Sequence, residues 1–182
     1  MRNGRHNGNG HKAPSTGTRP DHPLTWDDLC NDPRFQDLPY KIELNGRGQI
    51  IMSPTTNFHG SFAFKIGALM QKHLPDGEII VECAVDTADG VKEADAAWVS
   101  RKRWAVIRTE TSSSIAPEIC AEVVSRSNSR AEILAKKDLY LSAGAKEYWL
   151  CHESGKMEFF DSTGPIKKSK LCPKFPAAIR RS

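Results

Sequence analysis

Residues 117–125, PEICAEVVS, have the composition of a buried β-strand, yet they include two carboxylates. Because side chains alternate between the two faces of a strand, Glu118, Cys120, Glu122 and Val124 share one face. A charged side chain inside an apolar run costs free energy unless an opposite charge or a metal ion pairs with it. The stretch therefore predicts a core strand of a sheet in which Glu122 is either a metal ligand or an acid paired with a structural arginine or lysine.

A second strand with acidic residues precedes this one. Residues 92–100, KEADAAWVS, alternate so that Asp95 lies on one face with Glu93 and Ala97. Consecutive strands often pair, so we expect Asp95 and Glu122 to converge. Two carboxylates at one point suit Mg²⁺ or Mn²⁺, which polarises a phosphoryl group and lowers the pKa of its bound water. The alternative for Asp95 is a surface acid at the end of a strand.

The lysine that such a site needs is predicted to come from the helix that follows. Val124 stands where a lysine on the strand would project beside the cation. Lys136 lies one turn before Tyr140, on a helical face with Ile133 that is expected to look inward. Lys137 could take the same role. The alternative for Lys136 is an exposed ion pair with Glu132, four residues earlier.

The remaining pattern predicts a mixed α/β domain. The expected elements are a short helix capped by Thr25, strands at 41–44 and 48–52 around an Asn45-Gly46 turn, a helix at 57–73, strands at 78–85 and 92–100, the strand at 117–125, a helix capped by Ser127 or Ser129 that ends near 142, and strands at 147–151 and 156–161. This order indicates a central sheet with helices packed against it.

The length of 182 residues fits one domain with a tail. Residues 1–20 are rich in Gly, Asn, Arg and Pro and are expected to be disordered, and residues 21–182 are expected to form the domain, with the last ~20 residues basic and poorly defined. No apolar run approaches the ~20 residues that span a bilayer, and the start has no apolar signal segment. We therefore expect a cytoplasmic protein.

The charge is distributed unevenly. The whole chain carries +4, residues 1–20 carry +4 and residues 162–182 carry +6, so residues 21–161 carry −6. An acidic centre between basic ends fits a cation site flanked by phosphate-binding segments. It also fits a protein with solvated charged ends, which is the commoner case.

The five cysteines have no CxxC spacing, which argues against a zinc ribbon. Buried free thiols are the simplest interpretation. Cys120 as a nucleophile is the alternative, but it would need a histidine base that the neighbouring sequence does not supply.

Several fragments in a fixed order carry a resemblance: IELNG, MSP, HG, EADAAWV, EVVSRSNS, KKDLY and GAKEYWL. Over about residues 25–160, the chain resembles the Uma2 (Uma-two) family of proposed restriction endonucleases, a branch of the PD-(D/E)XK nuclease superfamily. The resemblance implies a restriction-endonuclease-like core, with a mixed central sheet flanked by helices, and metal-dependent hydrolysis of DNA.

The resemblance also implies roles for individual residues. Asp95 matches the motif aspartate, Glu122 the motif acid, and Lys136 the lysine that in this branch has moved from the strand to the following helix. Glu43 and His59 match the acidic and histidine positions of the N-terminal part. The family pattern is also matched by Tyr140 and Glu147-Tyr148-Trp149. The chain departs from it at Ala94, where the family has proline, and at Cys151-His152, where the family has Val-Asp.

The resulting hypothesis is a magnesium- or manganese-dependent endodeoxyribonuclease. Asp95 and Glu122 would hold the cation, Glu43 would assist through a water, Lys136 would orient the attacking water, and His59 would contact phosphate or shift the pKa of that water. The non-functional alternatives are that Glu43 faces solvent before a turn and that His59 contacts only backbone or solvent in the first turn of a helix. DNA would contact the basic residues 101–103 and the tails, and a homodimer is expected by analogy.

Two other functions remain open at the level of the sequence. One is an inactive DNA-binding protein with a nuclease fold, linked to a mobile element. The other is a hydrolase of small phosphorylated molecules, which would use the same metal chemistry.

Overall fold

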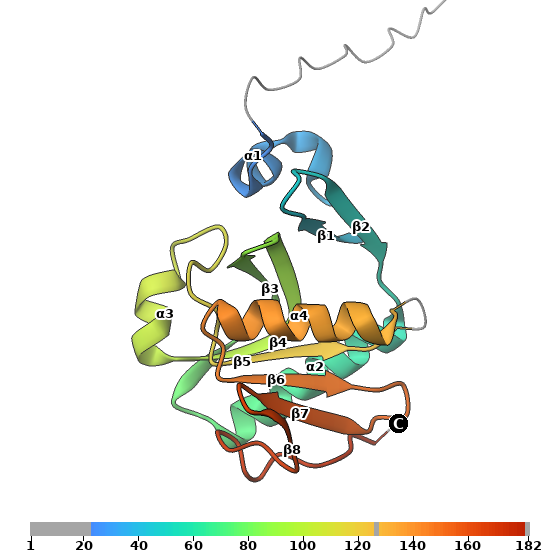
Figure 1. The fold of residues 1–182 in the computed structure, drawn as a ribbon, viewed down its shortest axis with the longest axis vertical. Helices are drawn as coiled ribbons and strands as arrows, with labels where there is room; N and C mark the ends of the chain where they lie inside the picture. Colours follow the sequence, from blue (N-terminus) through green and yellow to red (C-terminus); the bar gives the residue numbers. More distant parts are fainter. Residues whose placement is uncertain (1–22, 126–127, 181–182) are drawn as a thin grey trace, which may run out of the picture.

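A computed structural model describes residues 23–125 and 128–180 of the chain. The predicted disordered tail, residues 1–20, and the alternative helix cap Ser127 lie outside the described residues. Figure 1 shows a central sheet with helices on both faces. None of the helices in the described part is long and apolar enough to cross a membrane.

The N-terminal part consists of two short helices and a hairpin. Helix α1 (Trp26–Asn31) begins at Thr25, whose side chain forms a capping box with Asp28. It is followed by the 3₁₀ helix η1 (Pro33–Phe35). Strands β1 (Tyr40–Leu44) and β2 (Ile50–Pro54) pair antiparallel around a turn in which the Asn45 side chain accepts from the backbone N–H groups of Arg47 and Gln49.

The middle of the chain supplies the longest elements. Helix α2 (Asn57–His73) is capped by Thr56, and strands β3 (Gly77–Thr87) and β4 (Gly90–Ser100) pair antiparallel along most of their length. Helix α3 (Arg101–Ile107) follows directly, capped by the Ser100 side chain. The sequence did not predict α3, because seven residues with a basic start carry too little apolar periodicity to identify a helix.

The last part completes the sheet. Its elements are β5 (Ile119–Val123), α4 (Arg130–Ser142), β6 (Glu147–Cys151), β7 (Met157–Asp161) and β8 (Gly164–Ile166). Strands β5 and β6 are parallel and are joined by the crossover helix α4, which Ser129 caps together with Glu132, whereas the other pairs are antiparallel. The described residues thus form one mixed sheet of eight strands. Seven follow the order β2-β1-β4-β5-β6-β7-β8, and the eighth, β3, also pairs with β4. The three-residue strand β8 was not predicted.

The sheet forks at β4. Strand β3 pairs along the whole of one edge of β4, so β1 and β5 must share the other edge. Strand β1 pairs there through Leu44 and Val91, and β5 pairs through residues 119–121 with residues 96–98 of β4. Residues 92–95 of β4 therefore face the gap between β1 and β5, and side chains from all three strands can meet in it.

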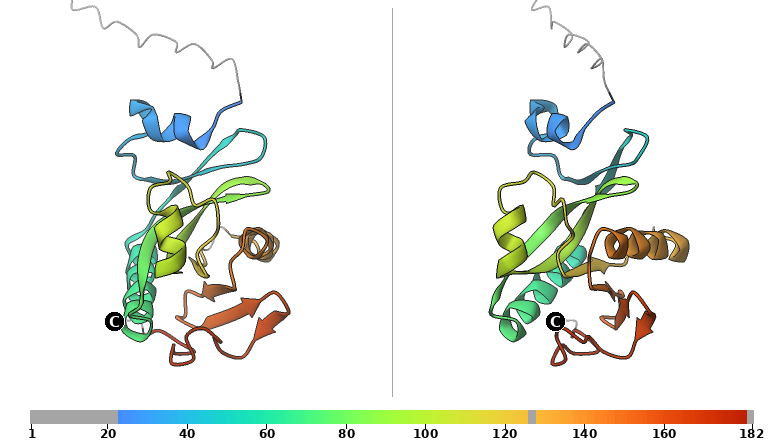
Figure 2. Two further views of the ribbon diagram at one scale, coloured as in Figure 1. Left: turned by 90° about the vertical axis from the view of Figure 1, so that its left-hand side faces the viewer. Right: turned by 60° about the vertical axis from the view of Figure 1, so that its left-hand side comes forward.

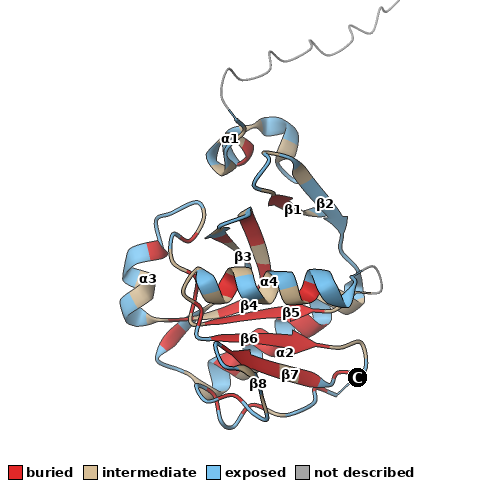
Figure 3. Ribbon diagram, viewed as in Figure 1, coloured by how far each residue is buried: buried red, intermediate tan, exposed pale blue. Residues whose placement is uncertain are grey.

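Two apolar clusters lie on opposite faces of the sheet (Figures 2 and 3). On one face, α2 packs through Phe62, Ile66 and Met70 against Trp149 and Phe159. The C-terminal segment, residues 172–179, covers the same face. On the other face, α4 packs through Ile133 and Tyr140 against Tyr148, Leu150 and Phe160. The gap at the fork lies between these two layers.

Candidate active site

The fork brings together three buried acids from three strands. Glu43 comes from β1, Asp95 from β4 and Glu122 from β5, and they are 8%, 2% and 8% exposed. The hydrogen bonds here show why the site forms at this point. The backbone N–H of Glu93 donates to Glu43 at 3.1 Å, and that of Val123 donates to Asp95 at 2.6 Å. These carboxylates thus take up backbone donors where the strand pairing has ended.

Asp95 is the most deeply buried of the three acids. Its Oδ1 lies 2.5 Å from Lys41 Nζ, and its Oδ2 lies 2.9 Å from Nε2 of His59, in the first turn of α2. Burial raises the pKa of Asp95, but the Lys41 ammonium and the His59 ring outweigh burial and hold that pKa well below its usual range. The hydrogen bond to Asp95 in turn raises the pKa of His59. Asp95 is therefore ionised, and His59 is biased toward its charged form.

Glu122 is bonded to donors from two other elements. Lys136 Nζ lies 3.2 Å and the Tyr140 hydroxyl 3.0 Å from its Oε1, and Lys41 Nζ lies 3.5 Å from its Oε2. Burial raises the pKa of Glu122, although Lys136 and Lys41 act in the opposite direction. The charge on Glu122 thus depends on these donors staying in place.

Lys136 is shared between two of the acids. Its Nζ donates to Glu43 Oε1 at 2.6 Å as well as to Glu122. Burial lowers the pKa of Lys136, but the nearby carboxylates, Glu122 first, outweigh burial and raise it. Lys136 is therefore a charged hydrogen-bond donor here and not a free amine.

The structure brings all five proposed site residues into one cluster: Glu43, His59, Asp95, Glu122 and Lys136. The alternative lysine, Lys137, lies outside it, because its Nζ is 3.0 Å from Asp138 and it stands over the ring of Phe160.

Sequence analysis missed one member of this cluster, Lys41. The signal was present in the sequence, because Lys41 and Glu43 are two residues apart on one strand and so share a face. The sequence-based hypothesis takes the positive side chain near the acids from α4 alone. In the structure, two lysines from different elements occupy the cluster.

Two other acids in or beside these strands differ in their surroundings. Glu118 immediately precedes β5 and accepts from the backbone N–H and hydroxyl of Ser100 at 3.0 and 2.6 Å, so its role is structural. Glu93, on β4, has a buried Oε2 with no hydrogen-bond partner among the described residues. Burial raises the pKa of Glu93 to about 7.

The donor set fits a hard divalent cation, since carboxylate oxygens are the ligands that Mg²⁺ and Mn²⁺ prefer. The unpartnered oxygen of Glu93 is in keeping with a site that takes a further positive group. Within residues 23–125 and 128–180, however, no three acidic, histidine or cysteine side chains form a ready-made metal-binding group. Instead, the ammonium groups of Lys41 and Lys136 lie against the acid oxygens.

A cavity of about 490 Å³ leads to the cluster from the side of α2. Lys41, His59 and Asp95 contribute to its inner wall, and the exposed side chains of Phe64 and Val81 to the remainder. A ligand of small-molecule or nucleotide size can therefore reach Asp95, Lys41 and His59.

The alternative site at Cys120 is not supported. The Cys120 side chain is fully buried, and burial raises the pKa of its thiol well above the usual value. The thiolate that a nucleophile requires is thus disfavoured. All five cysteines are free, and the four other than Cys30 are buried.

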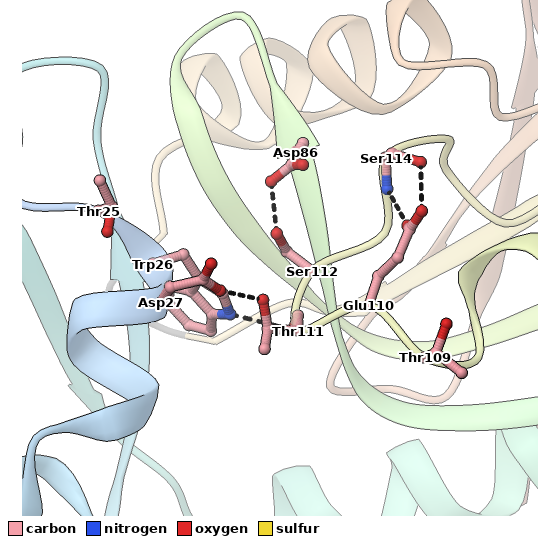
Figure 4. Close-up of a pocket in the computed structure, with 9 residues that line it drawn as sticks. All are labelled: Thr25, Trp26, Asp27, Asp86, Thr109, Glu110, Thr111, Ser112 and Ser114. Atoms are coloured by element: carbon pink, nitrogen blue, oxygen red, sulfur yellow. Dashed lines mark hydrogen bonds between the residues drawn. The ribbon is translucent and has the colours of Figure 1, made fainter.

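A second cavity, of about 460 Å³, lies between α1 and the loop 109–114 (Figure 4). Its polar groups bond to one another: Trp26 Nε1 donates to the carbonyl of Thr111 at 3.1 Å, and the Ser112 hydroxyl donates to Asp86 at 2.6 Å. Since these groups are already paired, the contacts serve to fasten α1 to the sheet.

Comparisons with known proteins bear on the family and the fold. The model of the Uma2 family, described as "Putative restriction endonuclease", matches residues 32–165. The fold is similar to a crystal structure from Anabaena variabilis described as a "putative nuclease belonging to DUF820", with a TM-score of 0.58 and 16% sequence identity over 85% of this chain and 82% of that one. None of the curated proteins compared matches the chain. The similarity confirms the mixed α/β fold with flanking helices.

Proposed function

The chain belongs to the Uma2 family, and from that premise we propose that it is a metal-dependent endonuclease that hydrolyses phosphodiester bonds of DNA. The observation that carries the proposal is the convergence of Glu43, Asp95 and Glu122 with Lys136 at the fork of the sheet. A buried cluster of this kind is costly to maintain, and perturbed ionisable groups beside a cavity are typical of catalytic sites.

The acids would hold the metal ion. Asp95 and Glu122 supply oxygens from neighbouring strands, and Glu43 would contribute through a water. A bound Mg²⁺ or Mn²⁺ supplies Lewis-acid polarisation of the phosphoryl group and a lowered pKa for its bound water.

The cationic side chains would handle the phosphate and the attacking water. Lys136, held charged by Glu122 and Glu43, can donate a hydrogen bond to a water or to a phosphate oxygen. His59, which Asp95 biases toward its charged form, faces the cavity and can donate to a phosphate oxygen from the opposite side. These donors would stabilise the charge that develops on the phosphate.

The DNA backbone would contact basic side chains outside the cavity. Arg101 and Lys102 at the start of α3 are exposed, as are the four lysines between residues 167 and 174. Arg103 is excluded from this role, because its guanidinium donates to the carbonyls of Ala116 and Gly144. Such contacts position a duplex without reading its sequence. A homodimer that cuts both strands belongs to the same proposal by analogy.

Two measurements on the same variants test the proposal. Manganese is titrated calorimetrically into the wild type and into Glu122→Gln, and cleavage of plasmid and duplex DNA is followed with Mg²⁺ or Mn²⁺. We expect metal binding and cleavage in the wild type and neither in a Glu122→Gln variant whose circular dichroism is unchanged. Lys136→Met should lower cleavage by roughly 10²–10⁴-fold, whereas Lys137→Met should retain it.

The alternatives give different results. Wild type that binds DNA but cleaves nothing with either metal would support the inactive DNA-binding protein with a nuclease fold. Cleavage of small phosphodiesters without cleavage of DNA would support the hydrolase of small molecules.

A further inference from the structure

Lys41 lies where two acids from different strands come closest. Its Nζ is 2.5 Å from Asp95 Oδ1 and 3.5 Å from Glu122 Oε2, and its side chain is only 9% exposed. A cation ligated by both acids through these two oxygens would occupy the position of the Lys41 ammonium, because the other oxygens, Asp95 Oδ2 and Glu122 Oε1, already accept from other donors. Lys41 therefore provides the positive charge between them in the structure as it stands.

The Lys41 ammonium and a divalent cation cannot both occupy the position between Asp95 and Glu122. Burial lowers the pKa of Lys41, but the surrounding carboxylates, Glu122 first, outweigh burial and raise it, so the group stays charged. Two positive charges within a few ångströms repel strongly where water is largely absent. The metal and the Lys41 ammonium thus compete for Asp95 and Glu122.

The ammonium group of Lys41 can move from the acids into an adjacent cavity. Lys41 also lines the cavity of about 490 Å³, together with Thr55, Asn57 and Ser61. A lysine stem has four carbons and bends freely, so the group can turn from the acids into this space. A phosphate of a DNA strand that enters the cavity would offer it a new partner.

We propose that Lys41 is a positioning residue that holds Asp95 and Glu122 together in the metal-free protein, leaves them when the cation binds, and then pairs with a phosphate of the substrate strand. This inference rests on the proposed nuclease function. It couples the two ligands, because a phosphate that draws Lys41 away makes room for the metal, and by linkage the metal favours the phosphate. Lys136 differs from Lys41 in its shorter contact, which is with Glu43 at 2.6 Å, whereas that of Lys41 is with Asp95 at 2.5 Å.

The test compares Mn²⁺ affinity with DNA cleavage, because the proposal predicts that removing Lys41 raises the first and lowers the second. Manganese is titrated calorimetrically into the wild type, Lys41→Gln and Lys41→Arg, with and without a short DNA duplex, and DNA cleavage is measured on the same proteins. We expect Lys41→Gln to bind Mn²⁺ alone about tenfold more tightly than the wild type, within the usual range of coupling between sites, and yet to cleave DNA more slowly. Lys41→Arg, which keeps the charge, should bind Mn²⁺ as weakly as the wild type.

Two further comparisons sharpen the test. Lys92→Gln is the matched control, because Lys92 is a lysine on β4 with a 6% exposed side chain that pairs with Asp89 outside the site; its Mn²⁺ affinity should equal that of the wild type. The duplex should raise the Mn²⁺ affinity of the wild type and raise that of Lys41→Gln much less. Lys41→Met replaces Lys41→Gln if circular dichroism shows that the latter does not fold.

The possible failures are distinguishable. If the wild type binds Mn²⁺, Glu122→Gln does not, and folded Lys41→Gln binds it no more tightly than the wild type, Lys41 does not compete and this inference is wrong while the proposed function stands. If neither the wild type nor Lys41→Gln binds Mn²⁺ even with the duplex, both fail together.

Discussion

Glu122 shows how a single charge is kept inside an apolar strand. It stands between Ala121 and Val123, both buried, and its two oxygens accept from Lys41, Lys136 and Tyr140. These three donors come from β1 and α4, so the cost of burying the carboxylate is offset by contacts that form only in the complete fold.

Tyr140 offers a test of this arrangement without removing a charge. Tyr140→Phe deletes the hydroxyl that donates to Glu122 at 3.0 Å but leaves the ring, which packs on Tyr148 with centroids 5.9 Å apart. Because hydrogen bonds to charged groups contribute about 1.5–3 kcal/mol, we expect the free energy of unfolding, measured in urea, to fall by about that amount.

Tyr148→Phe is the control for this prediction. Its hydroxyl also belongs to a buried tyrosine, but it donates to the neutral carbonyl of Ile133 over 3.4 Å. The expected loss is smaller, about 1 kcal/mol or less. Equal losses in the two variants would mean that the bond to Glu122 adds nothing beyond an ordinary buried hydroxyl.

The residue types at the site were largely predictable, whereas their partners were not. Alternation along β4 and β5 predicts that Asp95 and Glu122 converge, and in the structure Lys41 Nζ contacts both. The phase of α4 leaves Lys136 and Lys137 as alternatives, and the contact with Glu122 distinguishes Lys136. Lys41 shares a face with Glu43, but its two acid partners lie 54 and 81 residues away in sequence, so no local pattern pairs them.

Among the elements, the hairpin β1–β2 has the weakest attachment to the sheet. Its registered pairing with β4 is the single pair Leu44–Val91, beside the turn at Gly90. Gly90 has a positive φ of 78°, and a Cβ there would collide with the carbonyl of Leu44 and the backbone of Asn45. Since β1 carries Lys41 and Glu43, this junction positions two of the six residues of the cluster.

Gly90→Ala should therefore affect stability and metal binding together. The positive φ alone costs about 1–3 kcal/mol for a residue with a side chain, and the collision would push β1 away from β4. We expect a loss of at least that size in the free energy of unfolding, with weaker Mn²⁺ binding in the fraction that stays folded.

Gly60→Ala is the opposite case. Gly60 lies in α2 with nothing within 4 Å of the position of a Cβ, and alanine favours a helix. The expected change is a gain of roughly 0.5–1 kcal/mol. If both variants lost stability equally, the contact between Gly90 and β1 would not be the cause.

Prediction from sequence worked for elements with a clear period or cap and missed η1, α3 and β8. The helix at 57–73 has the predicted bounds, and the strands at 147–151 and about 157–161 form the expected hairpin. The fork at β4 was beyond reach, because the sharing of one strand edge by β1 and β5 depends on pairing between distant parts of the chain.

At the scale of the whole molecule, the C-terminal segment closes the core. Cys172, Phe175 and Ile179 are buried on the face of the sheet that α2 covers, and the ring of Phe175 lies 4.5 Å from that of Trp149. Pro173, Lys174 and Pro176 interrupt the apolar pattern, which has no helical or strand period. Only its basic charge was evident from the sequence.

Phe175→Ala tests how much the segment contributes. Truncating a buried phenylalanine typically costs about 3–5 kcal/mol, and we expect a loss of this size in urea denaturation, large relative to the total stability of a domain. The neighbouring exposed Lys174→Ala should change stability by no more than about 0.5 kcal/mol. A small effect of Phe175→Ala would show that the segment lies on the core without holding it.

The place of this segment in the chain also sets the timing of folding during synthesis. A ribosome adds roughly 5–20 residues per second, so the segment follows the last site-bearing helix, α4, by several seconds. During that interval the core that α2 forms with the sheet lacks the contacts of Cys172, Phe175 and Ile179. A nascent chain at this stage would present an apolar surface to chaperones. The acidic residues of the cluster would already be synthesised, while the core would not yet be closed.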